Sequence, residues 1–237
     1  RKDVLSAFFW LLALLAYGSY GYAEDFAGPK SLWTYTIQVN PDAFMAYNDL
    51  GAVFSGERRY DEAIEQFELS LRLNPVFLGT HFNLAGAYFE MGRYPEAVEA
   101  YKKMLKIDPH FGMGYNSLGN VYIKEGRTAE AKACYARAVQ LNPNYSDSQN
   151  NLGNILVHEG RLSEALEHYN QALRINPDYV EAHNSKGAVL ARMGDIAGAI
   201  REFQEVLRID PTHAAARSNL EQAQKFLAPA ELIGRLD

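Results

Sequence analysis

The sequence predicts an all-α fold, a right-handed solenoid of stacked helix-turn-helix hairpins. Prolines recur every 34 residues, each directly after an Asn or Asp: Pro41, Pro75, Pro109, Pro143, Pro177 and Pro211. Small and aromatic residues recur in the same register, and a glycine recurs between the two helices of most repeats. A fixed period of this length is typical of helical hairpin arrays, in which each hairpin buries its apolar face only against its neighbours.

An uncharged segment begins the chain. Residues 4–23 contain no Asp, Glu, Lys or Arg, and a helix needs about 20 apolar residues to cross a bilayer. Two basic residues precede the segment and two acidic residues follow it, which predicts repeats on the periplasmic, extracytoplasmic or luminal side. We expect residues 1–27 to form a hydrophobic transmembrane helix and a membrane anchor. A cleaved signal peptide and a buried helix that caps the array are the alternatives.

Residues 28–41 connect this segment to the repeats. Counted back from Pro41, Trp33 falls at the aromatic position of a second helix, and Ile37 follows one turn later. We therefore expect a half-repeat linker helix here.

Five full repeats occupy residues 42–213. In the first helix, a small residue allows the paired helix to approach closely: Gly51, Ala85, Gly119, Gly153 and Gly187. In the second helix, a large ring fills the seam: Phe67, Tyr101, Tyr135, Tyr169 and Phe203. Glycine between the helices suits a chain reversal with positive φ: Gly92, Gly126, Gly160 and Gly194.

Two local features of these repeats are expected from residue preferences. The first repeat lacks the turn glycine, and we expect its turn to shift to Gly56. Each proline is expected in the first turn of the next helix, capped by the preceding Asn or Asp. After the repeats, residues 214–237 should form a C-terminal capping helix and tail.

This pattern closely resembles the tetratricopeptide repeat (TPR) family over most of the chain. The resemblance implies a non-catalytic scaffold that presents a concave groove to a protein or peptide. Leu32, Trp33, Asn40 and Pro41, following an uncharged span, are also similar to the last span of membrane glycosyltransferases with C-terminal TPRs, such as the transmembrane-and-TPR O-mannosyltransferases. That similarity implies that the chain is the C-terminal region of a longer enzyme. Self-association through the array or the apolar segment is a further alternative.

Composition and spacing exclude several function classes. A formal net charge of −6 leaves no basic surface for nucleic acid. The single cysteine, Cys134, allows no internal disulfide. No two of the six histidines stand three or four residues apart, so no helical metal pair is expected. The sequence predicts no catalytic set, no metal and no cofactor.

Asparagine is frequent in the first helices, although its helix propensity is poor. The repeat register places these candidate binding residues on the concave face: Asn48, Phe82, Asn83, Asn116, Asn120, Asn150, Asn151, Asn154 and Asn184. An amide offers an acceptor and two donors, which match the peptide backbone. The row resembles the asparagine-lined TPR superhelix of O-linked N-acetylglucosamine transferases, and that resemblance implies an extended peptide ligand. The alternative is that these asparagines bond the neighbouring helix.

Overall fold

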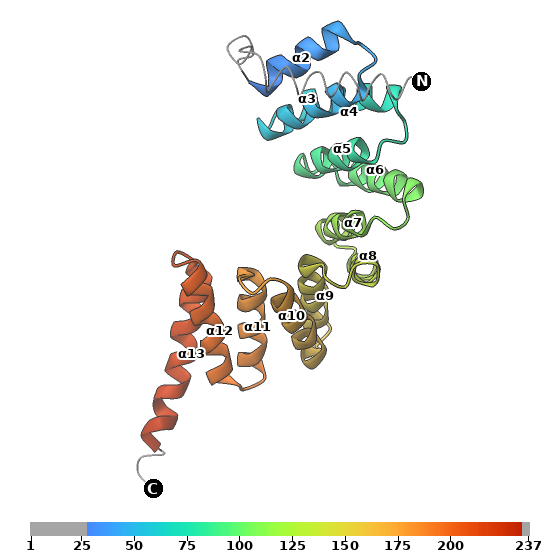
Figure 1. Ribbon diagram of the computed structural model, residues 1–237. Helices are drawn as coiled ribbons and strands as arrows, with labels where there is room; N and C mark the ends of the chain where they lie inside the picture. Colours follow the sequence, from blue (N-terminus) through green and yellow to red (C-terminus); the bar gives the residue numbers. More distant parts are fainter. Residues whose placement is uncertain (1–27, 234–237) are drawn as a thin grey trace. The chain divides into compact units, whose positions relative to one another are not determined.

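The computed structural model describes the backbone of residues 28–233 and the side chains of residues 28–226. Twelve α-helices follow one another in this part of the chain (Figure 1). They are α2 (Pro29–Val39), α3 (Phe44–Gly56), α4 (Tyr60–Leu73), α5 (Leu78–Glu90), α6 (Tyr94–Ile107), α7 (Gly112–Lys124), α8 (Thr128–Leu141), α9 (Ser146–His158), α10 (Leu162–Ile175), α11 (Val180–Arg192), α12 (Ile196–Ile209) and α13 (Ala214–Ile233). The all-α prediction is confirmed for these residues.

The transmembrane helix expected over residues 1–27 lies outside the described residues. Of the helices between Pro29 and Ile233, none combines the length and the apolar character that crossing a membrane requires.

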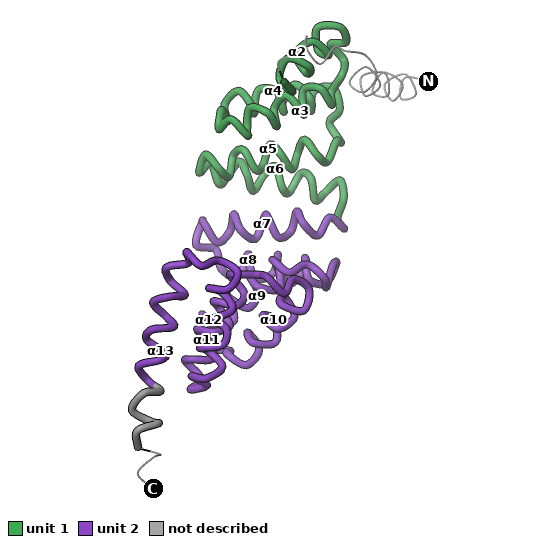
Figure 2. The backbone as a smooth tube through the Cα atoms, turned by 60° about the vertical axis from the view of Figure 1, so that its left-hand side comes forward, with its two compact units in different colours: residues 1–109 green, residues 110–237 purple. Residues whose placement is uncertain are grey.

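The chain divides into two compact units, residues 1–109 and 110–237 (Figure 2). In unit 1, α3 pairs with α4 and α5 with α6, and α2 packs on α3. In unit 2 the pairs are α7–α8, α9–α10 and α11–α12, and α13 packs on α12. The predicted array of helical hairpins is therefore present in each unit. Its right-handed sense and the domain boundaries stay predictions.

Close packing inside each hairpin depends on the small residue of the first helix. A Cβ added to Gly153 would lie 2.7 Å from the Tyr169 ring, and one added to Gly119 would lie 2.6 Å from Tyr135. Both distances are far inside van der Waals contact, so in these two hairpins the absence of a side chain lets the ring lie against the first helix.

The turn between α3 and α4 differs from the sequence prediction. Gly92, and its counterparts in the following three repeats, adopts a positive φ as expected. In the first repeat, however, Gly56 is the last residue of α3, and Arg58 has a φ of 61°. Arg58 stands 34 residues before Gly92, so the turn has not shifted. The expectation for Gly56 was wrong because the hairpin geometry fixes which position takes positive φ, even at the cost of strain in a non-glycine residue.

The Asn-Pro and Asp-Pro pairs also act differently from the prediction. Asn74 directly follows α4 and caps its C-terminus, and the Asn74 Oδ1 accepts the backbone N–H of Val76 at 3.4 Å. The same side-chain bond forms at Asn40, Asn142, Asn176 and Asp210. These residues therefore make Asx turns after a helix rather than capping the next one. Each proline lies in that turn, before the following helix begins.

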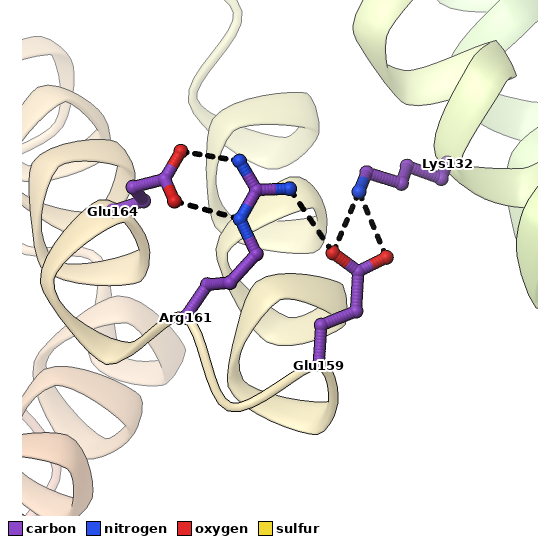
Figure 3. Close-up of polar contacts among 4 residues, drawn as sticks. All are labelled: Lys132, Glu159, Arg161 and Glu164. Carbon is purple, nitrogen blue, oxygen red and sulfur yellow. Dashed lines mark hydrogen bonds and ion pairs between the residues drawn. The ribbon is translucent and has the colours of Figure 1, made fainter.

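Exposed arginine and glutamate side chains form ion pairs at the turns between the two helices of a hairpin. In Figure 3, Arg161 donates to Glu164 at 2.6 and 2.5 Å and to Glu159 at 3.2 Å. Glu159 also accepts from Lys132 of α8 at 2.6 Å. The same arginine–glutamate pair, three residues apart, recurs at Arg93 and Glu96. These groups are exposed, so each ion pair adds little to the stability of the fold.

Candidate functional site

An open polar pocket lies on the first helices of unit 2. Its cavity volume is about 560 Å³. The residues that line it are Asn116, Asn120, Asp147, Asn150, Asn151, Asn154, Tyr179, Glu181, Asn184, Ser185 and His213. They come from α7, α9 and α11 and from the turns that precede α11 and α13. Apart from the Tyr179 ring, every one of these side chains is polar or charged.

The structure brings most of the sequence-predicted residues together. Six candidates line the pocket: Asn116, Asn120, Asn150, Asn151, Asn154 and Asn184. The other three, Asn48, Phe82 and Asn83, belong to unit 1, where Phe82 packs edge-on against Tyr101. The binding residues predicted from the sequence do not include the other five lining residues, Asp147, Tyr179, Glu181, Ser185 and His213. A signal was present, because Asp147 and Glu181 stand at the same register of successive repeats.

One class of asparagine links successive first helices. The Asn116 Oδ1 accepts the Ser148 hydroxyl at 3.0 Å and the Asn151 Nδ2 at 3.2 Å. In unit 1 the Asn48 Oδ1 accepts from Thr80 and Asn83 in the same register, at 3.0 and 3.1 Å. Asn48 and Asn116 are both buried, and buried amides need such partners. For these two residues the interpretation as bonds to the neighbouring helix holds.

A second class pairs with the tyrosine of its own hairpin. The Tyr135 hydroxyl donates to the Asn120 Oδ1, and the Tyr169 hydroxyl donates to the Asn154 Oδ1, both at 2.7 Å. Burial raises the pKa of Tyr169 to about 12, so the phenol remains a donor at neutral pH. In the first and fifth repeats the equivalent pairs have no polar group: Ala52 with Phe67, and Ala188 with Phe203. The second repeat breaks this correspondence, because Tyr101 is matched there with Gly86.

Asn150 departs from both classes. Its side chain is 4% exposed, and its Oδ1 is buried without a hydrogen-bond partner among the described residues. By repeat register, the donors to this oxygen would come from positions 182 and 185. These positions carry Ala182 and Ser185 in place of the Thr or Ser and the Asn found around Asn48 and Asn116. The pocket wall therefore contains a buried acceptor without a donor, which is energetically costly.

The groups left for a ligand are mainly amide donors. The oxygens of Asn120, Asn154 and Asn184 already accept hydrogen bonds. Within residues 28–226, the Nδ2 groups of these three asparagines make no hydrogen bond. The pocket can therefore donate to peptide carbonyls from these asparagines, while their acceptor half is already used inside the protein.

Two carboxylates give the pocket negative charge. Asp147 lies in the first turn of α9 and Glu181 in the first turn of α11. Burial raises the pKa of Tyr179. The charge of the Asp147 carboxylate, to which the Tyr179 hydroxyl hydrogen bonds, raises it as well. His213 Nδ1 accepts the backbone N–H of Ala216 at 3.1 Å, so a neutral His213 carries its proton on Nε2. Over the described part of the chain, no group of three His, Cys, Asp or Glu side chains could hold a metal ion.

A further polar cluster braces α11 against α12. His183 directs Nε2 to the Pro177 carbonyl at 2.9 Å and Nδ1 to Glu202 at 2.6 Å. Lys186, which replaces a leucine of the other repeats, pairs with the same carboxylate at 2.7 Å. Burial opposes protonation of His183, but Glu202 and the carbonyl outweigh it and raise the pKa. Since both ring nitrogens face acceptors, the geometry requires the imidazolium form.

His81 occupies the same register in unit 1. Its Nε2 lies 2.8 Å from the Pro75 carbonyl, but its Nδ1 is buried without a partner among the described residues. The position equivalent to Glu202 is Ala100. Sequence reasoning missed this bond to the proline carbonyl, which Gln149 and Arg217 also make.

Comparison with known proteins identifies the repeat. Models described as TPR repeat or tetratricopeptide repeat match residues 46–77, 80–111, 113–145, 134–167, 153–194 and 180–213. The comparison with curated proteins found no match.

Solved structures share the fold. YrrB, described as a TPR protein with an unusual peptide-binding site, is 23% identical with a TM-score of 0.61, covering 78% of this chain and 96% of its own. MamA is 25% identical with a TM-score of 0.61, covering 72% and 93%. PilF of Pseudomonas aeruginosa is 17% identical with a TM-score of 0.76, covering 93% and 99%.

Proposed function

Because the chain belongs to the tetratricopeptide repeat family, we propose that it is a scaffold whose α7, α9 and α11 face holds an extended peptide segment of a partner protein. TPR repeat proteins are typically non-catalytic modules that bind proteins or peptides. The assignment of an extended ligand to this face rests on the chain's own amides. YrrB is described as having a peptide-binding site, which is consistent with a ligand of this class.

The observation that carries the proposal is the row of unused Nδ2 donors at Asn120, Asn154 and Asn184 in one open pocket. An extended peptide presents carbonyl oxygens along its length, and these need donors when they leave water. Donors from successive first helices can meet such a chain without contacting its side chains. The pocket would then bind a backbone conformation, with side-chain preference added by other groups.

A paired substitution tests this face with little damage to the fold. Asn120→Ala with Tyr135→Phe, and Asn154→Ala with Tyr169→Phe, remove both ends of two hydrogen bonds. They leave the residue pairs that the first and fifth repeats carry naturally. We expect the quadruple variant of the full chain to lose most binding to an array of random peptides, while its circular dichroism spectrum is unchanged. Retention of the whole peptide set would show that these amides are not the binding site.

A control removes charge on the outside of the same hairpins. Glu159 and Glu164 belong to the exposed network of Figure 3 and line no part of the pocket. Glu159→Gln with Glu164→Gln should leave peptide binding unchanged.

We also propose that residues 4–23 anchor the scaffold to a membrane, with the repeats on the periplasmic, extracytoplasmic or luminal side. The absence of charge from this segment and the flanking charges support this. The test is vesicle flotation of the full chain against a version without residues 1–27, followed by protease protection in cells. Flotation of both forms alike would remove the anchor from the proposal. Release of a shortened, soluble chain would favour the signal-peptide alternative.

The relation to membrane glycosyltransferases stays a prediction from Leu32, Trp33, Asn40 and Pro41, and the comparisons provide no evidence for it. The reading frame upstream of Arg1 tests it. Further membrane spans with acidic loop motifs would support an enzyme, and a start codon directly upstream would exclude one.

A further inference from the structure

The charges that line the pocket are all negative. Asp147 and Glu181 belong to the lining, whereas no Lys or Arg does. The two carboxylates stand 34 residues apart, so they occupy corresponding positions at the starts of α9 and α11. A ligand in the pocket therefore lies in the field of two carboxylates from neighbouring repeats.

The start of a helix does not by itself account for these carboxylates. Negative charge is favoured near any helix N-terminus, yet the corresponding positions of the other first helices carry Met45, Gly79 and Met113. The repeat thus tolerates an uncharged residue here, and the two acidic residues occur on α9 and α11, which also carry the free amide donors of Asn154 and Asn184.

The pocket wall also contains hydrogen-bond acceptors that have no donor among the described residues. Asn150 lines the pocket, is 4% exposed and has a buried Oδ1 without a hydrogen-bond partner among the described residues. No hydrogen bond or ion pair of Glu181 is found within residues 28–226. A ligand group that brings both positive charge and several N–H donors would satisfy these acceptors together. Lysine and arginine side chains have that chemistry.

We infer that this pocket selects extended peptide segments that carry a lysine or arginine, whose side chain pairs with Asp147 and Glu181 while the asparagines hold the backbone. This inference rests on the proposed function and adds the ligand's charge to it. An acidic segment is repelled by the same two groups, so the pocket discriminates by charge as well as by backbone.

Blocked seven-residue peptides of alternating serine and alanine test it, with lysine, norleucine or glutamate at the centre. Norleucine keeps the aliphatic stem of lysine and removes only the charge and its donors. With the full chain at low salt, fluorescence polarisation should show lysine binding about fivefold more tightly than norleucine, and glutamate binding more weakly than both. The lysine advantage should shrink as salt is added, because exposed charges are screened.

The isosteric variant Asp147→Asn with Glu181→Gln should bind the lysine and norleucine peptides equally. Glu159→Gln with Glu164→Gln makes the same change in net charge outside the pocket and should keep the full lysine advantage. Equal affinity of the unaltered chain for the lysine and glutamate peptides would overturn the inference and leave the proposed function intact. If neither these peptides nor the random array binds, the proposed function fails and this inference fails with it.

Discussion

The first helices of the two units have the same helical backbone but carry chemically different side chains at corresponding positions. In unit 1, the positions equivalent to Asp147 and Asn150 carry Gly79 and Phe82 on α5, and Phe82 packs against Tyr101. In unit 2, the same register supplies carboxylates and amides to a polar pocket. Both units nevertheless join successive first helices through a buried asparagine, Asn48 or Asn116. Asparagine in this repeat thus has two separable roles, and unit 2 combines them in a pocket.

The difference shows that stacking and surface chemistry are set by different columns of the repeat. Glycine against a ring, the Asx turn and the buried asparagine recur in both units and hold the hairpins together. The residues that contact solvent in the pocket vary without disturbing those contacts. Changes in the first set should therefore alter stability, and changes in the second should alter binding.

The largest expected effect compares the two buried asparagines. Asn116→Ala removes the partner of the Ser148 hydroxyl, whose atoms are fully buried, and should lower the free energy of unfolding by about 2 kcal/mol. Asn48→Ala should cost about half as much, because the Thr80 hydroxyl keeps Ser70 as a partner at 2.9 Å. Urea denaturation of the full chain measures both. Equal losses would show that Ser70 does not compensate.

The next effect completes the bond that Asn150 lacks. Ala182→Ser places a hydroxyl where Thr80 and Ser148 have theirs, and should stabilise the chain by about 1 kcal/mol by donating to the Asn150 Oδ1. The matched control is Ala216→Ser, which faces Asn184, whose oxygen already accepts from Asn219. A smaller gain is expected there. A loss of stability in Ala182→Ser would contradict the assignment of that oxygen as lacking a donor.

A smaller effect concerns the strained turn of unit 1. Arg58→Gly relieves a positive φ of 61° in a non-glycine residue, and should stabilise the chain by about 0.5 kcal/mol after the entropy cost of glycine. In unit 2, Gly126, with a φ of 75°, should show the reverse: Gly126→Ala should cost about 1 kcal/mol. Thermal unfolding followed by circular dichroism measures both. A destabilised Arg58→Gly chain would mean that the arginine side chain makes contacts that outweigh the strain.

The smallest effect compares His183 with His81 as pH changes. The pKa of His183 is raised, so its contribution to stability is present below its unfolded pKa and is lost as pH rises through the folded value. The pKa of Glu202 is lowered, so its contribution is present above the unfolded value and is lost as pH falls through the folded one. The unfolding midpoint should therefore fall as pH is raised through the folded pKa of His183.

Two variants isolate this dependence. His183→Gln introduces the residue that Gln149 provides one repeat earlier, and should remove the fall that begins above the unfolded pKa of histidine. His81→Gln should leave the fall unchanged, because the position facing His81 Nδ1 carries Ala100 rather than a carboxylate. A His183→Gln chain that keeps the full pH dependence would place its origin elsewhere.

The sequence predicted the hairpins well because their signals are local and repeated. The 34-residue spacing, the glycine that faces the ring in four of the five repeats and the positive-φ glycines from Gly92 onward all have a direct physical meaning. It failed where one motif permits two geometries. Asn-Pro suits both a helix cap and an Asx turn, and Gly56 was an available but unused turn residue.

The candidate site was predicted in part, for a related reason. Register alone placed Asn116, Asn120 and Asn154 near one another, but it does not reveal which half of an amide is already bonded. That depends on partners such as Ser148, which lies 32 residues away, and on the tyrosine of the same hairpin. Asparagine occurs with tyrosine in the third and fourth repeats, and alanine with phenylalanine in the first and fifth. This partial correlation between two columns was visible in the sequence, and Gly86 with Tyr101 in the second repeat breaks it.

The bond between asparagine and tyrosine makes the repeat modular for protein engineering. Since the tyrosine hydroxyl and the asparagine amide bond each other within one hairpin, a hairpin with alanine and phenylalanine at these positions lacks both groups. Replacing Ala188 with asparagine and Phe203 with tyrosine would introduce this hydrogen-bonded pair into the fifth repeat without repacking it. The length of ligand that the repeats contact could then be extended one hairpin at a time, by two substitutions in each hairpin.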